Sequence, residues 1–119
     1  MTAEVRWLEA LAAHAGIPEI PALSPVALER LQKIVDGFDL SEAQRVKSIE
    51  DTTNHDVKAV EYYLKERINN HPELLAVKEF IHFACTSEDI NNLAHGMMLR
   101  DARDKVLLPA IDKLIKSLT

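Results

Sequence analysis

The chain has 119 residues, of which 47% are hydrophobic and 28% are charged, and its formal net charge is −5 at pH 7. This composition supports a packed core and excludes an extensively disordered chain. The negative charge, without any cluster of basic residues, argues against a nucleic-acid-binding surface. A single cysteine excludes an internal disulfide and fits a reducing compartment. No apolar run is long enough to span a membrane, so we expect a soluble cytoplasmic protein.

Helical periodicity of the apolar residues divides the chain into a series of predicted helices, and no segment alternates at the period of a strand. In chain order the predicted helices cover residues 2–15, 25–37, 42–51, 54–69, 72–84 and 88–118. Turn residues and polar clusters separate them. The sequence therefore predicts an all-α fold.

Residues that commonly cap helices mark several of the predicted boundaries. Thr2 is expected to cap the first helix, and Gly16 follows that helix as a stop signal. In a capping box, a hydroxyl and a carboxylate or amide three residues later satisfy exposed backbone N–H groups. We predict such boxes at Ser41, Thr53 and Thr86.

The last predicted helix is the longest, at roughly 30 residues or about 45 Å. Pro109 lies inside it and is expected to kink or break it, because proline removes one backbone donor. A helix of this length normally packs in a bundle with partners of similar length, and the preceding helices are too short. We therefore expect residues 1–87 to form a partial N-terminal helical domain and residues 88–119 to begin a truncated helical bundle. The uncovered apolar residues of 97–118 should drive self-association.

Two polar turns at predicted helix starts are the candidate binding sites. One is Asn54-His55-Asp56 and the other is Thr86-Ser87. A helix start exposes N–H groups and the positive end of the helix dipole, which suit a carboxylate or a phosphate. An antiparallel pair of helices between the turns would bring both to one end of a bundle. The alternative is that these residues only cap helices, which is their commonest use.

His82 lies inside an apolar run just before the second turn. An imidazole in this setting either presents one ring nitrogen to a bound anion or is a core histidine bonded to a backbone carbonyl. The sequence leaves both readings open.

The sequence gives little support for a metal site, a catalytic cysteine or a phosphate-binding loop. His82, Cys85 and His95 do not have the spacing that would complete a tetrahedral metal shell. The cysteine has no recognisable partners for a nucleophile's triad, and the glycines are isolated, so no phosphate loop is present. We read Glu88 and Asp89 as first-turn partners of the helix dipole. The sequence predicts neither a metal nor a cofactor.

Two stretches closely resemble the bacterial adenylosuccinate lyases of the fumarase/aspartase superfamily. Residues 51–65 contain Thr-Asn-His-Asp-Val-Lys-Ala-Val, and residues 79–92 contain Phe-Ile-His-Phe-Ala-Cys-Thr-Ser-Glu-Asp. The Thr-Ser-x-Asp turn is shared across the superfamily, whereas the first motif is much narrower. Residues 4–15 also match, so the resemblance covers most of the chain.

The resemblance implies an all-α homotetramer that acts on a nucleotide substrate. Such enzymes eliminate fumarate from adenylosuccinate and from an earlier succinyl-carboxamide ribotide, in AMP and IMP biosynthesis. Their active sites combine three subunits. By position, the resemblance implies substrate contacts for Asn54, His55 and Asp56, binding of the succinyl or fumarate part by Thr86 and Ser87, and a place in the pocket region for His82.

The chain also departs from the family pattern. It lacks the Thr-His-Gly turn that carries the proposed general acid, the Met-Pro-x-Lys-x-Asn-Pro loop that carries the serine base, and the arginine–tyrosine segment before the first helix. We therefore expect an N-terminal fragment with binding residues but no catalytic residue, inactive alone. The alternative is a stand-alone helical interaction module without catalysis. Argininosuccinate lyase and fumarase fit less well, because they lack the Asn54-His55-Asp56 context.

Overall fold

The computed structural model describes residues 1–118, and every regular element in this range is helical. The elements are α1 (Thr2–Ala13), α2 (Pro25–Asp36), α3 (Leu40–Thr53), α4 (Asp56–Ile68), α5 (Pro72–Ala76), a 3-10 turn (Lys78–Phe80), α6 (Ser87–Ala102), a π-helical turn (Arg103–Leu107) and α7 (Leu108–Leu118). The predicted all-α class is confirmed. Residue 119, the end of the predicted bundle segment, lies outside the described residues.

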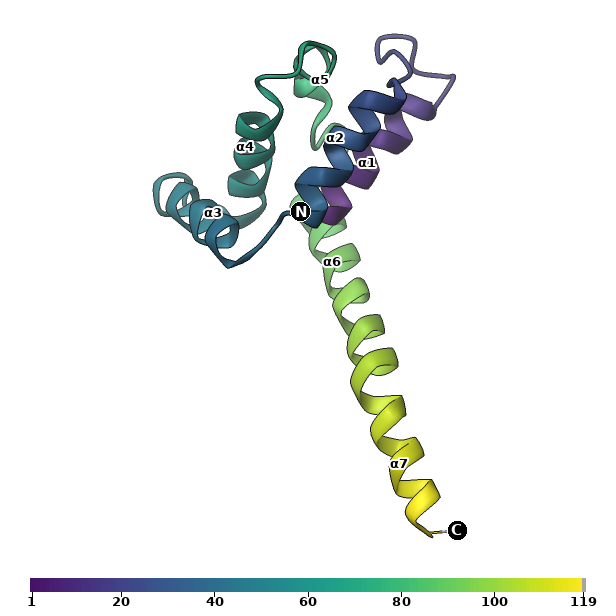
Figure 1. Cartoon of the computed structure of the whole chain (residues 1–119). Coiled ribbons are helices and arrows are strands. Elements are labelled where there is room, and N and C mark those ends of the chain that lie inside the picture. The colour runs from purple at the N-terminus through teal and green to yellow at the C-terminus, as the bar shows by residue number, and fades with distance from the viewer. Residues whose placement is uncertain (119) are drawn as a thin grey trace.

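Helices α1 to α5 gather into one body, and α6 with α7 extends from it as a long arm (Figure 1). The molecule measures 59 × 36 × 25 Å and has a radius of gyration of 17.5 Å. A compact domain of 100 residues has a radius of gyration of about 13 Å. The arm accounts for the excess. In the part of the chain that the structure describes, no helix is both long and apolar enough to cross a membrane.

The main core lies inside the body and draws on α1, α2, α4 and α5. Its most deeply buried side chains include Leu8, Leu31, Tyr63, Ile68 and Leu74. Each of these four helices turns toward the core the apolar stripe that helical periodicity predicts. Burial of large apolar side chains such as these is the dominant favourable contribution to folding.

A second, smaller cluster joins the arm to the body. Ala3 of α1, Val57 of α4 and Ile90 of α6 are buried together, with Cys85 packed against them. Val57 follows Asp56 directly, and Ile90 lies in the first turn of α6. This packing therefore fixes the N-terminal ends of α4 and α6 next to each other.

Several predicted helix ends near the start of the chain are wrong. Met1, not Thr2, is the N-cap of α1, and the helix ends at Ala13 rather than at residue 15. The N–H of Gly16 instead donates to the Nδ1 atom of His14 at 3.1 Å, so a local turn replaces the last helical turn. Ser24 caps α2, which ends before Gly37 as predicted.

The predicted capping boxes at Ser41 and Thr53 are also wrong. Asp39 is the N-cap of α3 and accepts a hydrogen bond from the N–H of Glu42. Thr53 is the last residue of that helix, and Asn54 ends it in the left-handed conformation, with φ of 51°. His55 then caps α4, so one helix ends and the next begins within two residues.

The predicted helix 72–84 divides into the short helix α5 and a 3-10 turn. His82 and Ala84 then have φ of 65° and 58°, in the left-handed region that no α-helix allows. Tertiary contacts to α1, described below, override the helical periodicity of this apolar run.

The predicted kink or break near Pro109 takes the form of a π-helical turn after the end of α6 at Ala102, and the arm continues through the proline as α7 (Figure 1). The π-helical turn at 103–107 lies just ahead of this proline. In this turn the N–H of Leu108 bonds to the carbonyl of Arg103, five residues earlier, so the hydrogen-bonding pattern changes just before the proline, which has no N–H to donate.

Candidate functional site

The two polar turns predicted as binding sites meet through one side-chain contact. The Nε2 atom of His55 lies 3.2 Å from the hydroxyl oxygen of Ser87, across 32 residues of sequence. His55 is the N-cap of α4, and Ser87 is the first residue of α6. The predicted convergence of the two helix starts is therefore confirmed.

The hydrogen bonds of His55 determine whether the hydroxyl group of Ser87 can donate to a ligand. The Nδ1 atom of His55 accepts the N–H of Lys58 at 3.2 Å, which caps α4. In the neutral ring the proton then sits on Nε2, which donates to the oxygen of Ser87. The hydroxyl hydrogen of Ser87 is left to donate elsewhere. A bound carboxylate is a suitable acceptor.

Asp56 makes a second link between the two helices. One carboxylate oxygen accepts the N–H of Val57 at 2.7 Å, and the other accepts from the side-chain amide of Asn91 at 3.4 Å. The hydrogen bond from Val57 is the largest cause that lowers the pKa of Asp56, and Asn91 and the nearby His55 lower it further. Asp56 is therefore an anion at neutral pH and orients the amide of Asn91.

The side chain and the backbone N–H of Thr86 form hydrogen bonds within the first turn of α6. Its hydroxyl and backbone N–H both donate to the carboxylate of Asp89, at 2.9 and 2.7 Å, while its hydroxyl oxygen accepts the N–H of Asp89. These bonds form the capping box predicted at this position. The hydrogen bonds of Thr86 also lower the pKa of Asp89. The hydroxyl hydrogen of Thr86 is therefore used within the turn, and the ligand contacts expected of Thr86 and Ser87 stay predictions.

Asn54 is exposed and sits at the bend between α3 and α4. Its left-handed backbone suits asparagine, which adopts this conformation more readily than most residues. It turns the chain so that His55 can cap the next helix.

His82 is bonded to a carboxylate rather than to a backbone carbonyl. Its Nδ1 atom lies 2.7 Å from an oxygen of Glu4, which is fully buried in α1. The His82 side chain keeps 19% of its surface exposed. It lies in the segment that leads directly into Thr86 and Ser87.

Cys85 and the nearby acidic residues offer no nucleophile or metal site. Burial, together with the charges of Glu4 and Asp89, raises the pKa of the Cys85 thiol. The thiol is therefore protonated at neutral pH and is a poor nucleophile. Across residues 1–118, no group of three or more His, Cys, Asp or Glu is arranged to hold a metal ion.

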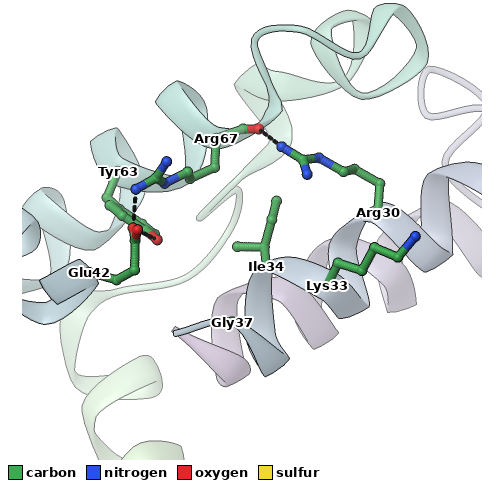
Figure 2. A pocket seen from close by; sticks show the side chains of 7 residues that line it. All are labelled: Arg30, Lys33, Ile34, Gly37, Glu42, Tyr63 and Arg67. Carbon is green, nitrogen blue, oxygen red and sulfur yellow. Dashed lines mark hydrogen bonds and ion pairs between the residues drawn. The ribbon is translucent and has the colours of Figure 1, made fainter. Parts of the chain in front are cut away.

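A separate pocket of about 160 Å³ lies between α2, α3 and α4 (Figure 2). It is lined by Arg30, Lys33, Ile34, Gly37, Glu42, Tyr63 and Arg67. Glu42 accepts hydrogen bonds from Tyr63 and Arg67, and Arg30 donates to the carbonyl of Arg67 at 3.0 Å. Both arginines therefore already have partners. The pocket also lies along the C-terminal half of α4, away from the end capped by His55.

Sequence reasoning missed three residues that shape the site: Asn91, Glu4 and Trp7. Glu4 carried a readable signal, because it lies four and seven positions before the buried Leu8 and Leu11 and so on the apolar face of α1. A carboxylate there needs a buried partner. Asn91 and Trp7 gave no such signal in the sequence.

Comparison with known proteins places the chain in a family. A sequence model described as lyase matches residues 1–119. Adenylosuccinate lyase from Escherichia coli K12 is 62% identical over 112 residues, which make up 94% of this chain and 25% of that protein. The adenylosuccinate lyase of Haemophilus influenzae is 60% identical over 116 residues, or 98% of this chain and 25% of that protein. That of Vibrio cholerae is 57% identical over 115 residues, or 97% of this chain and 25% of that protein. The chain thus spans about a quarter of the length of these relatives and belongs to the lyase family.

Proposed function

We propose that this chain supplies part of the substrate-binding surface of an adenylosuccinate lyase. The enzyme would eliminate fumarate from adenylosuccinate and from the related succinyl-carboxamide ribotide in purine nucleotide biosynthesis. The similarity to adenylosuccinate lyases over nearly the whole chain supports this assignment. The observation that carries it is the contact between His55 and Ser87, which joins two anion-compatible helix starts into one site.

In this proposal Ser87 holds a carboxylate of the succinyl group. Its hydroxyl hydrogen is available because His55 already donates to its oxygen. The N–H groups in the first turn of α6 and the positive end of that helix favour the same negative charge. Asn54, His55 and Asp56 would contact the rest of the substrate, and His82 would line the same pocket.

The reaction breaks the bond between the substituted nitrogen and the succinyl carbon. A base removes a proton from the neighbouring carbon, the new double bond forms, and the nitrogen leaves with the C–N electron pair and takes a proton. Negative charge builds on the carboxylate next to the deprotonated carbon, so donors placed there lower the barrier. We propose that this chain provides such donors, while the base and the acid lie in segments outside it. The 119 residues alone would then be inactive.

We further propose that the complete enzyme is a cytoplasmic homotetramer in which other subunits complete the site. The domain boundary would lie at residues 87 and 88, where α6 begins. The arm supports this assembly, because its large apolar side chains are exposed along most of its length. Examples are Leu93, Leu107 and Leu114, at 57%, 55% and 60% exposure.

Fumarate release tests the proposal. The intact protein that contains this sequence should convert adenylosuccinate to AMP and fumarate, and the 119-residue chain should not. If the intact protein binds no succinyl purine and releases no fumarate, the alternative of a helical interaction module is favoured. Fumarate release by the 119-residue chain at the rate of the intact protein would show that the catalytic groups are inside it.

A further inference from the structure

Glu4 is a buried carboxylate that satisfies only part of its hydrogen-bonding capacity. None of its surface is exposed, and one oxygen contacts the Nδ1 atom of His82 at 2.7 Å across 78 residues of sequence. The other oxygen has no hydrogen-bond partner among residues 1–118. Burying a carboxylate in this way opposes folding unless its partner compensates. A buried carboxylate at this position therefore indicates a function that an apolar side chain could not perform.

The segment that Glu4 contacts has an unusual backbone. His82 and Ala84 both adopt the left-handed conformation, which L-residues with a Cβ atom disfavour. Such conformations persist only where the surroundings hold them in place. The segment 82–85 leads directly to Thr86, the N-cap of α6, and to Ser87.

Helix α1 makes two hydrogen bonds to this segment. Glu4 bonds to the side chain of His82, and the indole N–H of Trp7 donates to the carbonyl of Phe83 at 2.7 Å. Glu4 and Trp7 are three residues apart and so lie on the same face of α1. One contact holds a side chain and the other holds the backbone of the next residue. Together they fix both the path of the segment and the orientation of the His82 ring.

We propose that Glu4 is a positioning residue for the substrate site, acting through His82 on the segment that places Ser87. This inference rests on the proposed function. A carboxylate oxygen of Glu4 accepts the Nδ1–H of His82, which selects one ring tautomer and leaves Nε2 without a proton and able to accept a hydrogen bond. It also ties the segment before α6 to α1, so this contact, together with the packing of Val57 against Ile90, sets the distance between Ser87 and His55.

The electrostatics of the pair agree with this role. Burial raises the pKa of Glu4, whereas the hydrogen bond and the charge of His82 lower it. Burial is the larger effect, so the pKa of Glu4 stays above its ordinary value, and His82 and the N-terminal amino group offset only part of the cost of burying the carboxylate.

The test uses the intact lyase with substitutions at Glu4. Glu4→Met keeps the length and helix propensity of the side chain but removes the acceptor, whereas Glu4→Gln keeps an acceptor oxygen. Glu61→Met is the matched control, because Glu61 is also a buried carboxylate, at 5% exposure, but is paired with Lys58 and Lys65 on its own helix. Trp7→Phe removes only the second anchor.

For Glu4→Met we expect the KM for adenylosuccinate to rise by about ten- to a hundredfold, by analogy with the loss of a group that orients a metal ligand. Glu4→Gln should restore most of this loss, Trp7→Phe should raise KM less, and Glu61→Met should leave KM unchanged. A crystal structure of the Glu4→Met variant should show the His55–Ser87 contact lengthened. If Glu4→Met fails to fold, Trp7→Phe and Glu4→Gln decide the question by the same KM comparison.

Unchanged KM and an unchanged His55–Ser87 distance in Glu4→Met, with only a lower melting temperature, would overturn the proposal. The outcome is separable from that of the proposed function. If the unsubstituted protein releases no fumarate, the proposed function fails. The crystal structure of the variant then still decides whether Glu4 positions Ser87.

Discussion

His55 and Ser87 connect two helix N-termini, with 3.2 Å between the ring nitrogen Nε2 and the hydroxyl oxygen. His55 does two things at once, because its other ring nitrogen caps α4 by accepting the N–H of Lys58. The positive ends of α4 and α6 are thereby held at one place. Two such ends favour an anion more than either does alone.

His55→Asn separates the capping role from the binding role. Asparagine is among the best N-cap residues, so α4 should keep its stability within a few tenths of a kcal/mol. Its shorter side chain does not reach Ser87. In the intact enzyme we expect kcat/KM for adenylosuccinate to fall by about tenfold or more, with a nearly unchanged melting temperature measured by calorimetry. A variant with lower stability and normal kcat/KM would support the capping-only reading.

Ser87→Ala removes the hydroxyl that we assign to a substrate carboxylate. Thr86 and Asp89 form the cap without Ser87, so the fold should lose little stability. Loss of a hydrogen bond to a charged group corresponds to about 1.5–3 kcal/mol, or roughly ten- to a hundredfold weaker binding. Fumarate and succinyl-substrate affinities measured by calorimetry on the intact enzyme check this. Ser48→Ala, at an exposed serine on α3, serves as the control.

Local sequence patterns were sufficient for the helical class and for several helix starts. Ser24 and Thr86 cap helices as predicted, because their hydroxyls meet N–H groups only three residues away. The sequence offered the meeting of the two polar turns as a geometric possibility, and the turns do meet, although the second helix of the expected pair is broken. The substrate contacts assigned to these turns stay predictions.

The remaining errors arose where distant contacts override local preference. Residues 80–84 read as helix because their apolar residues have helical spacing, yet Glu4 and Trp7 hold this segment in another conformation. Histidine is not a preferred cap, so His55 was not recognised as one. A pattern confined to neighbouring residues contains no information about a partner 76 or 78 positions away.

The capping box of α6 should make stability depend on acid pH. Hydrogen bonds from Thr86 hold the pKa of Asp89 below its ordinary value of 3.8, so the folded state favours the ionised carboxylate. This contribution is present above pH 3.8 and is lost as the pH falls through the lower pKa of the folded state. Asp89→Asn should therefore show a shallower loss of unfolding free energy below about pH 4.

Urea titrations at a series of acid pH values measure this dependence. Glu88→Gln is the matched control, because it removes a charge from the same helical turn but leaves the capping box intact. An identical acid profile for Asp89→Asn and the unsubstituted chain would show that the box does not stabilise the fold through Asp89.

The arm should cause the 119-residue chain to self-associate. Ile111 and Leu114 are 41% and 60% exposed on α7, where large apolar side chains lie on the surface. Patches of this kind on soluble proteins mark interaction surfaces. Sedimentation velocity at increasing concentration should show oligomers, and the double substitution Ile111→Glu with Leu114→Glu should give monomers. Lys113→Glu adds negative charge without removing an apolar side chain and should leave the oligomers in place; a purely monomeric unsubstituted chain would contradict this prediction.

A double-mutant cycle between His55→Asn and Ser87→Ala in the intact enzyme tests the central claim, that the two helix starts act as one anion site. The measured quantity is the dissociation constant of fumarate or of a succinyl substrate in all four proteins. We predict a coupling free energy of about 0.5–3 kcal/mol, because removing either residue already disables the shared donor. Effects of the two substitutions that simply add, with no coupling, would contradict the account.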